Sequence, residues 1–162
     1  MAAQSTPYRF GDLLALARQS WVGQMAAGLA AAGYPDYRGS DAAAVRLLRR
    51  GPLPVGRLGD ALGVSRQAAR KVVTGLEQRG FAAVQQDERD ARQRNVALTT
   101  EGEAYAVALS AVIDRLNRDL ARRVDADQLA AADVVLRAVL VDEHARALAA
   151  YLPGPPGRTA RR

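Results

Sequence analysis

The side chains with the most informative spacing lie between residues 65 and 94. Five hydrogen-bond donors recur at helical intervals in one short stretch: Arg66, Gln67, Arg70, Lys71 and Thr74. Arginine and lysine suit guanine edges, glutamine suits adenine edges, and hydroxyls suit phosphates. Downstream, the segment DERDARQR (87–94) carries three arginines, and the negative potential of a minor groove attracts arginine. These residue types indicate binding to duplex DNA rather than catalysis.

Two short helices would present this row of donors. Leu58 and Leu62 are four residues apart, which predicts a helix over 57–62 with both leucines on one face. Gly63 permits a tight left-handed exit, and Ser65 is a good N-cap for a second helix from Arg66 to about Arg79. Gly80 stops that helix. Its buried stripe is expected to be Ala69, Val72, Val73 and Leu76. The order is that of a helix-turn-helix motif.

A β-hairpin wing is predicted after the second helix. Residues 81–84 and 95–98 suit two short strands, and the charged segment between them suits an exposed tip. Asp87 and Asp90 would hold the arginines in position through charge-assisted hydrogen bonds. The residues expected to contact DNA are therefore Ser65, Arg66, Gln67, Arg70, Lys71, Thr74, Arg89, Arg92 and Arg94.

These motifs resemble the MarR (multiple antibiotic resistance regulator) family of bacterial winged-helix transcription factors. The wing carries the resemblance: residues 87–92 followed by 96–99 and Gly102 fit the pattern D-x-R-D-x-R…L-T-x-x-G. Gly63-Val64-Ser65 and residues 76–80 match the family's helix boundaries. The resemblance covers about residues 52–102 and extends more weakly over 10–150.

The resemblance implies a homodimer that binds pseudo-palindromic operator DNA, as a repressor released by a small aromatic or anionic effector. One departure concerns Ala68-Ala69, where the family often has a polar Ser or Thr cluster. Base recognition would then depend more on Gln67, Arg70 and Lys71. The competing hypothesis is a winged-helix module that binds another protein and not DNA.

Amphipathic helices flank the motif on both sides. We expect one over 10–32, stopped by Gly33, and another through Leu48, capped by Ser40 or Asp41. After the wing, Thr100 with Glu103 suggests a capping box for a helix of about twenty residues. Asp125 with Gln128 suggests a second box, for a last helix reaching Leu148.

The predicted fold is therefore mainly α with a small β-hairpin wing: a winged helix-turn-helix flanked by long dimerisation helices. We expect an N-terminal dimerisation helix with a connecting helix over 10–50, and a DNA-binding lobe over 51–99. C-terminal dimerisation helices would occupy 100–152, and a flexible basic tail 153–162. Three long helices outside the lobe exceed what one small core needs, which favours a second subunit.

The charge distribution supports a nucleic-acid partner. Residues 46–98 contain eleven basic and five acidic residues, a net charge of +6, whereas residues 99–152 carry −3. Positive charge concentrated on one lobe is what phosphate binding requires. The absence of cysteine fits a cytoplasmic protein and, with the single histidine His144, argues against a metal site. We expect no cofactor, no catalytic residue and no membrane association.

An effector site is less clearly signalled. Members of the family generally bind effectors between the dimerisation helices and the DNA-binding lobe. Such a cleft could be lined by Arg18, Trp21, Tyr34, Tyr37 and Arg38, which would suit a phenolic or other aromatic anion. The alternative is that Trp21 and the two tyrosines pack in the core or in a subunit interface.

Overall fold

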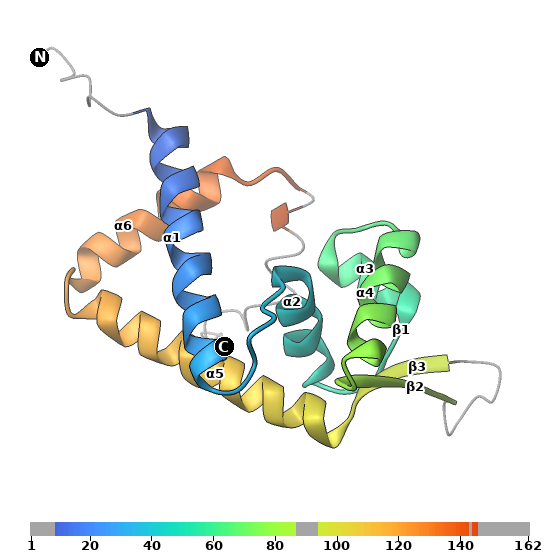
Figure 1. Ribbon diagram of the computed structural model, residues 1–162. Coiled ribbons are helices and arrows are strands. Elements are labelled where there is room, and N and C mark those ends of the chain that lie inside the picture. The colour runs from blue at the N-terminus through green and yellow to red at the C-terminus, as the bar shows by residue number, and fades with distance from the viewer. Residues whose placement is uncertain (1–8, 87–93, 143, 146–162) are drawn as a thin grey trace, which may run out of the picture. The chain divides into compact units, whose positions relative to one another are not determined.

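The computed structural model describes residues 9–86, 94–142 and 144–145. It is mostly helical with one three-stranded sheet (Figure 1), so the predicted fold class is confirmed. The chain forms two compact units, one ending at Tyr37 and one beginning at Arg38. No helix in the described part of the chain is both long and apolar enough to span a membrane.

The helix-turn-helix consists of α3 (Val55–Leu62) and α4 (Arg66–Gln78). Gly63 between them has φ +67°, a left-handed conformation that favours glycine. The Ser65 hydroxyl accepts a hydrogen bond from the Ala68 amide at 3.2 Å, as an N-cap does. The helices cross closely, since a Cβ on Gly59 would lie 3.2 Å from that of Ala69. The predicted turn and cap are therefore confirmed.

The wing is a hairpin of β2 (Ala82–Gln86) and β3 (Arg94–Leu98), paired antiparallel with Ala82 opposite Leu98. A third strand, β1 (Leu53–Pro54), pairs with the other edge of β3, and sequence analysis did not predict it. Two residues are too few to show an alternating pattern. This strand therefore holds the segment that leads into α3 against the base of the wing.

Helix α2 (Gly39–Leu48) packs against α3, α4, β3 and the following long helix, and it contributes much of the core. Val45 is fully buried, as are Leu58 of α3 and Leu76 of α4. The expected cap at Ser40 or Asp41 is wrong: the N-cap is Arg38, without a side-chain hydrogen bond. Asp41 lies in the first turn but is buried, and its carboxylate pairs with Arg79.

Helix α5 (Thr100–Ala121) follows the wing, and α6 (Ala126–Val139) follows α5. The predicted box at Thr100 and Glu103 is one residue late, because Thr99 is the N-cap and accepts from the Gly102 amide at 3.0 Å. The box at Asp125 and Gln128 is confirmed, with both reciprocal hydrogen bonds present. Helix α6 ends at Val139 and Leu140 is extended, so one unbroken helix to Leu148 is wrong.

The first unit contains α1 (Phe10–Ala31) and the segment that follows it. Gly33 has φ +92°, and the Tyr34 amide donates to the Leu29 carbonyl at 2.8 Å, which closes the helix as predicted. Met25 and Leu29 are buried, whereas Leu13 and Leu16 are 57% and 64% exposed. The N-terminal half of α1 thus presents apolar side chains to its surroundings.

Candidate nucleic-acid interface

Helix α4 separates its apolar and polar side chains as predicted. Ala69, Val73 and Leu76 are buried, whereas Val72, which was also predicted to be buried, is only half-buried. The exposed side chains include every donor singled out in sequence: Arg66, Gln67, Arg70, Lys71 and Thr74. The first four lie in the first two turns of the helix, close to the positive end of the helix dipole, which favours an anion. The exposed face of α4 is therefore rich in donors.

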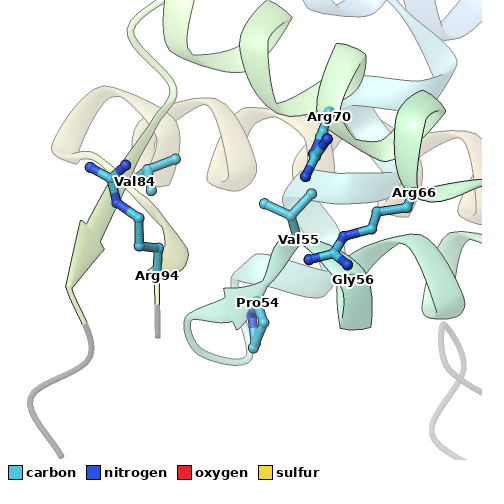
Figure 2. Close-up of a pocket in the computed structure, with 7 residues that line it drawn as sticks. All are labelled: Pro54, Val55, Gly56, Arg66, Arg70, Val84 and Arg94. Carbon is cyan, nitrogen blue, oxygen red and sulfur yellow. The ribbon is translucent and has the colours of Figure 1, made fainter. Parts of the chain in front are cut away.

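Three arginines meet at a hollow beside this face. It has a volume of about 500 Å³ and is lined by Pro54, Val55, Gly56, Arg66, Arg70, Val84 and Arg94. We call it the arginine hollow. Figure 2 shows the guanidinium groups of Arg66 and Arg70 extending from α4 toward Val55, with Arg94 opposite them on the wing. None of its lining residues is acidic, so its charge suits a phosphate or another anion.

The fold explains why these three arginines come together. The β2–β3 register places Gln86 opposite Arg94 at the outer end of the described hairpin. Strand β1 leads directly into α3, which brings Pro54, Val55 and Gly56 between the wing and α4. Arg66 and Arg70 are one helical turn apart and therefore lie on the same side of α4. Residues 54–56 were not part of the predicted site.

The arginine hollow does not include all of the residues predicted to bind DNA. Arg89 and Arg92 lie outside the described residues, as do Asp87 and Asp90. Ser65 is exposed, but its hydroxyl caps α4.

Of the residues predicted to bind an effector, Arg18 is exposed and Trp21 half-buried, both on α1 of the first unit. Tyr34 and Tyr37 are half-buried in the segment that follows α1. Arg38 belongs to the second unit, where its Nη1 lies 3.8 Å from the position that a Cβ on Gly75 of α4 would occupy. Arg38 therefore lies alongside α4.

Within residues 9–86, 94–142 and 144–145, no three His, Cys, Asp or Glu side chains are grouped so as to hold a metal ion. The site is therefore described by guanidinium, ammonium, amide and hydroxyl donors on α4 and the wing. A helix-turn-helix, a wing and this donor set define a protein of the winged-helix class with a candidate DNA-binding face.

Comparisons with known proteins agree with this class. The family model described as the MarR family matches residues 38–93, which span α2, the helix-turn-helix and the start of the wing. No curated protein matches the chain. A probable transcriptional regulator from Pseudomonas aeruginosa is 26% identical, with a TM-score of 0.65, over 82% of this chain and 97% of that one.

Two further solved structures share the fold. A MarR variant from E. coli complexed with operator DNA has a TM-score of 0.67 at 21% identity, covering 81% of this chain and 93% of that one. The Bordetella bronchiseptica protein BpsR, whose DNA binding is regulated by 6-hydroxynicotinic acid, has a TM-score of 0.64 at 22% identity, covering 82% and 96%. The likeness to the MarR family is carried by residues 38–93, about a third of the chain. The Pseudomonas aeruginosa relative is a probable transcriptional regulator, which is the class that the sequence analysis predicted.

Proposed function

We propose that this protein is a homodimer that binds double-stranded, pseudo-palindromic operator DNA and represses transcription from the cytoplasm until a small aromatic or anionic effector releases it. Helix α4 would lie in the major groove, with Gln67, Arg70 and Lys71 toward base edges. Arg66, Arg70 and Arg94 would hold one phosphate strand at the arginine hollow. Arg89 and Arg92 of the wing tip would reach the adjacent minor groove.

The observation that carries this proposal is the arginine hollow itself. Three arginines, two from α4 and one from β3, line one hollow with a volume of about 500 Å³. Arg66, Arg70 and Arg94 form no ion pair with any of the described residues. Like charges gathered without a counter-charge repel one another, and a bound phosphate would relieve that repulsion. The E. coli relative that is complexed with operator DNA shares the fold, which supports DNA as the ligand.

Fluorescence anisotropy with labelled duplexes at several salt concentrations tests DNA binding. Replacing Arg70 with alanine should weaken binding and lower the slope of log K against log salt by about 0.9, the contribution of one neutralised phosphate. Arg115→Ala is the matched control, because Arg115 is an exposed arginine on α5, outside the arginine hollow. It removes the same charge and should leave the slope nearly unchanged.

Equal effects of the two substitutions would show that only net charge matters, and would refute a docking site at the arginine hollow. If the unaltered protein showed no salt-dependent affinity for any duplex, that result would favour the alternative hypothesis of a module that binds another protein. Selection of bound fragments from random duplexes would then also fail. A selected sequence with two related half-sites would support a dimer on a pseudo-palindrome.

Apolar side chains on the outer helices support the homodimer. Helix α6 has no buried residue, and Val134, Leu136 and Val139 are 68%, 47% and 49% exposed. Large exposed apolar patches mark interaction surfaces. We propose that α6, the end of α5 and the first half of α1 pack against a second copy of the chain. Size-exclusion chromatography with light scattering should give a dimer at micromolar concentration, and a monomer would count against this.

The proposed effector site comprises Arg18, Trp21, Tyr34, Tyr37 and Arg38. Two arginines and three aromatic rings suit an aromatic carboxylate, through charge-assisted hydrogen bonds and ring stacking. The control of BpsR by 6-hydroxynicotinic acid supports an effector of that kind. Titration calorimetry with a panel of phenolic and heteroaromatic acids tests the site, and Arg18→Ala should weaken any binding. Absence of heat and of any change in DNA affinity across the panel would remove the proposal.

A further inference from the structure

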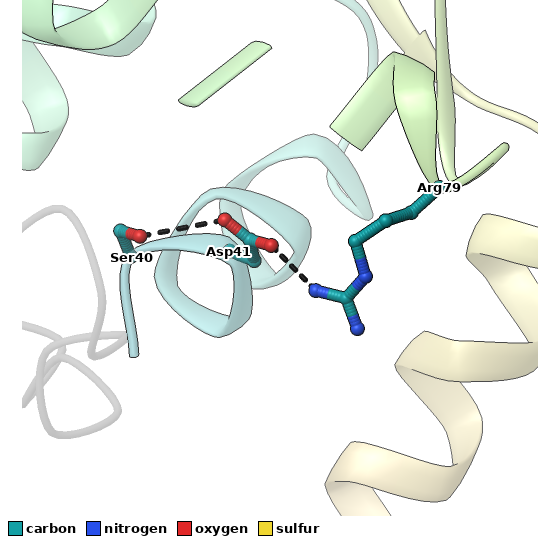
Figure 3. A network of polar contacts seen from close by, with 3 residues as sticks. All are labelled: Ser40, Asp41 and Arg79. Atoms are coloured by element: carbon teal, nitrogen blue, oxygen red, sulfur yellow. Dashed lines mark hydrogen bonds and ion pairs between the residues drawn. The ribbon is translucent and has the colours of Figure 1, made fainter. Parts of the chain in front are cut away.

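One arginine of the DNA-binding helix is turned away from the exposed donor face. Arg79 is the C-cap residue of α4, and its side chain is only 16% exposed. Its Nη1 lies 2.6 Å from Oδ2 of Asp41 on α2, whose side chain is 3% exposed. Figure 3 shows this pair, with the Ser40 hydroxyl donating to the other carboxylate oxygen at 3.3 Å. The pair joins the end of α4 to the start of α2.

Two aromatic rings complete the surroundings of this guanidinium. Its carbon lies 4.6 Å from the centroid of the Phe81 ring and 5.7 Å from that of Tyr105, distances at which a cation is attracted to a ring face. The rings are stacked on each other, with centroids 4.6 Å apart and planes 9° apart. Both residues are buried. We call Asp41, Arg79, Phe81 and Tyr105 the Arg79 cluster.

Hydrogen bonds from Thr99 connect the segments around the Arg79 cluster. The Thr99 amide donates to the Phe81 carbonyl at 3.1 Å, and the Thr99 hydroxyl donates to the Gly80 carbonyl at 2.5 Å. Thr99 also caps α5. The end of α4, the start of the wing and the start of α5 therefore meet at one joint, and the Arg79 cluster connects that joint to α2.

We propose that Arg79 is a positioning residue: it holds the DNA-binding helix at a set orientation relative to α2 and α5, and so contributes to operator discrimination without contacting DNA. This inference rests on the proposed function. A guanidinium that is ion-paired and stacked inside the lobe is not available to a phosphate. Buried ion pairs require one close geometry, because a displaced partner leaves an uncompensated charge.

The two components of DNA affinity depend differently on this orientation. Phosphate attraction is long-ranged and tolerates a shift of the helix, whereas hydrogen bonds to base edges do not. Loosening the Arg79 cluster should therefore reduce binding to a selected sequence much more than binding to unrelated DNA. Charge alone predicts the opposite for Asp41, because removing an anion from the lobe should strengthen binding to any duplex.

The test uses the full-length protein, with two duplexes of equal length as probes. One is selected from a random library by the unaltered protein, and the other is a scrambled version. Asp41→Asn and Arg79→Met disrupt the cluster. Glu77→Gln is the control for Asp41→Asn, since Glu77 is an exposed acid on α4 and its loss changes the net charge equally. Circular dichroism melts establish that each variant is folded at the assay temperature.

We expect Asp41→Asn to lower affinity for the selected duplex roughly 3- to 30-fold, and to change affinity for the scrambled duplex by less than about twofold. Glu77→Gln should not weaken either. Arg79→Met should lose the same discrimination with an unchanged salt slope. A slope reduced by about 0.9 would mean that Arg79 contacts a phosphate and would overturn the proposal. If the folded variants discriminated between the selected and the scrambled duplex as well as the unaltered protein does, that result would also overturn the proposal.

Amide hydrogen exchange gives a second measurement, which needs no DNA. It tests the inference even if no duplex can be selected. Failure to select a duplex would count against the proposed function and not against the role of Arg79. Arg79→Lys keeps the charge but loses the planar guanidinium, and serves if the other variants do not fold. In a folded Arg79 variant, exchange should accelerate both around residues 76–84 and around 99–105. Unchanged exchange at 99–105 would show that Arg79 does not hold α4 to α5, and would refute the inference.

Discussion

Gly102, in the first turn of α5, is the position where one added methyl group should have the largest structural effect. A Cβ built on Gly102 would lie 1.9 Å from the Phe81 carbonyl oxygen and 2.8 Å from the carbonyl carbon. Both neighbouring atoms belong to backbone, so no side chain can rotate away. Ordinary contact begins at 3.4 Å, and the two segments would have to separate by about 1.5 Å.

That separation would break a defined set of hydrogen bonds. The Thr99 amide could no longer reach Phe81, nor the Thr99 hydroxyl Gly80, and the cap of α5 would be disturbed. With about 1 kcal/mol for each bond and for the cap, Gly102→Ala should cost about 3 kcal/mol of unfolding free energy. The wing would also shift relative to α5.

Urea unfolding followed by circular dichroism measures this change in free energy. Gly23→Ala is the matched control, because Gly23 lies inside α1 with no atom within 4 Å of its added Cβ. Alanine there should stabilise by roughly 0.5–1 kcal/mol, since it favours a helix interior over glycine. If Gly102→Ala cost less than about 1 kcal/mol, the close contact between α5 and the wing base would not exist in solution.

Three further predictions test the cap, the core and the subunit interface. Ser65→Ala should lower the free energy of unfolding by about 1 kcal/mol through loss of the α4 N-cap, as a denaturant titration would report, and no loss would contradict the observed hydrogen bond. Leu76→Ala, at a fully buried position, should cost about 2–5 kcal/mol in the same assay, and a smaller loss would mean that the site is not packed as described. Leu136→Asp should convert the proposed dimer to a monomer in size-exclusion chromatography with light scattering, because it places a charge on the apolar face of α6. An unaffected dimer would exclude that face from the interface.

Several features of the fold were predictable because they depend on local sequence. The left-handed turn at Gly63, the cap at Ser65 and the stop at Gly80 each arise from the backbone preferences of one residue. The donor face of α4 followed from helical spacing, since the apolar stripe determines which side is exposed. The capping box at Asp125 was likewise a local pattern.

The errors occurred where tertiary contacts compete with local preference. Asp41 is a plausible cap for α2, but its carboxylate pairs with Arg79, which is 38 residues away in sequence. Thr99 caps α5 in place of Thr100 because its amide and hydroxyl also bind Phe81 and Gly80. Neither choice leaves a signal in the spacing of nearby residues.

The sequence by itself determined which side chains offer donors suited to DNA and which elements carry them, since side-chain chemistry and helical periodicity are local properties. The tertiary structure alone decided that Arg66, Arg70 and Arg94 line one hollow, through the pairing of β1 with β3. It also decided that Arg79, an arginine like the others in sequence, is held inside the lobe by Asp41 and two aromatic rings. An arginine's role depends on which partners the fold brings within reach of its guanidinium, and those partners come from distant parts of the chain.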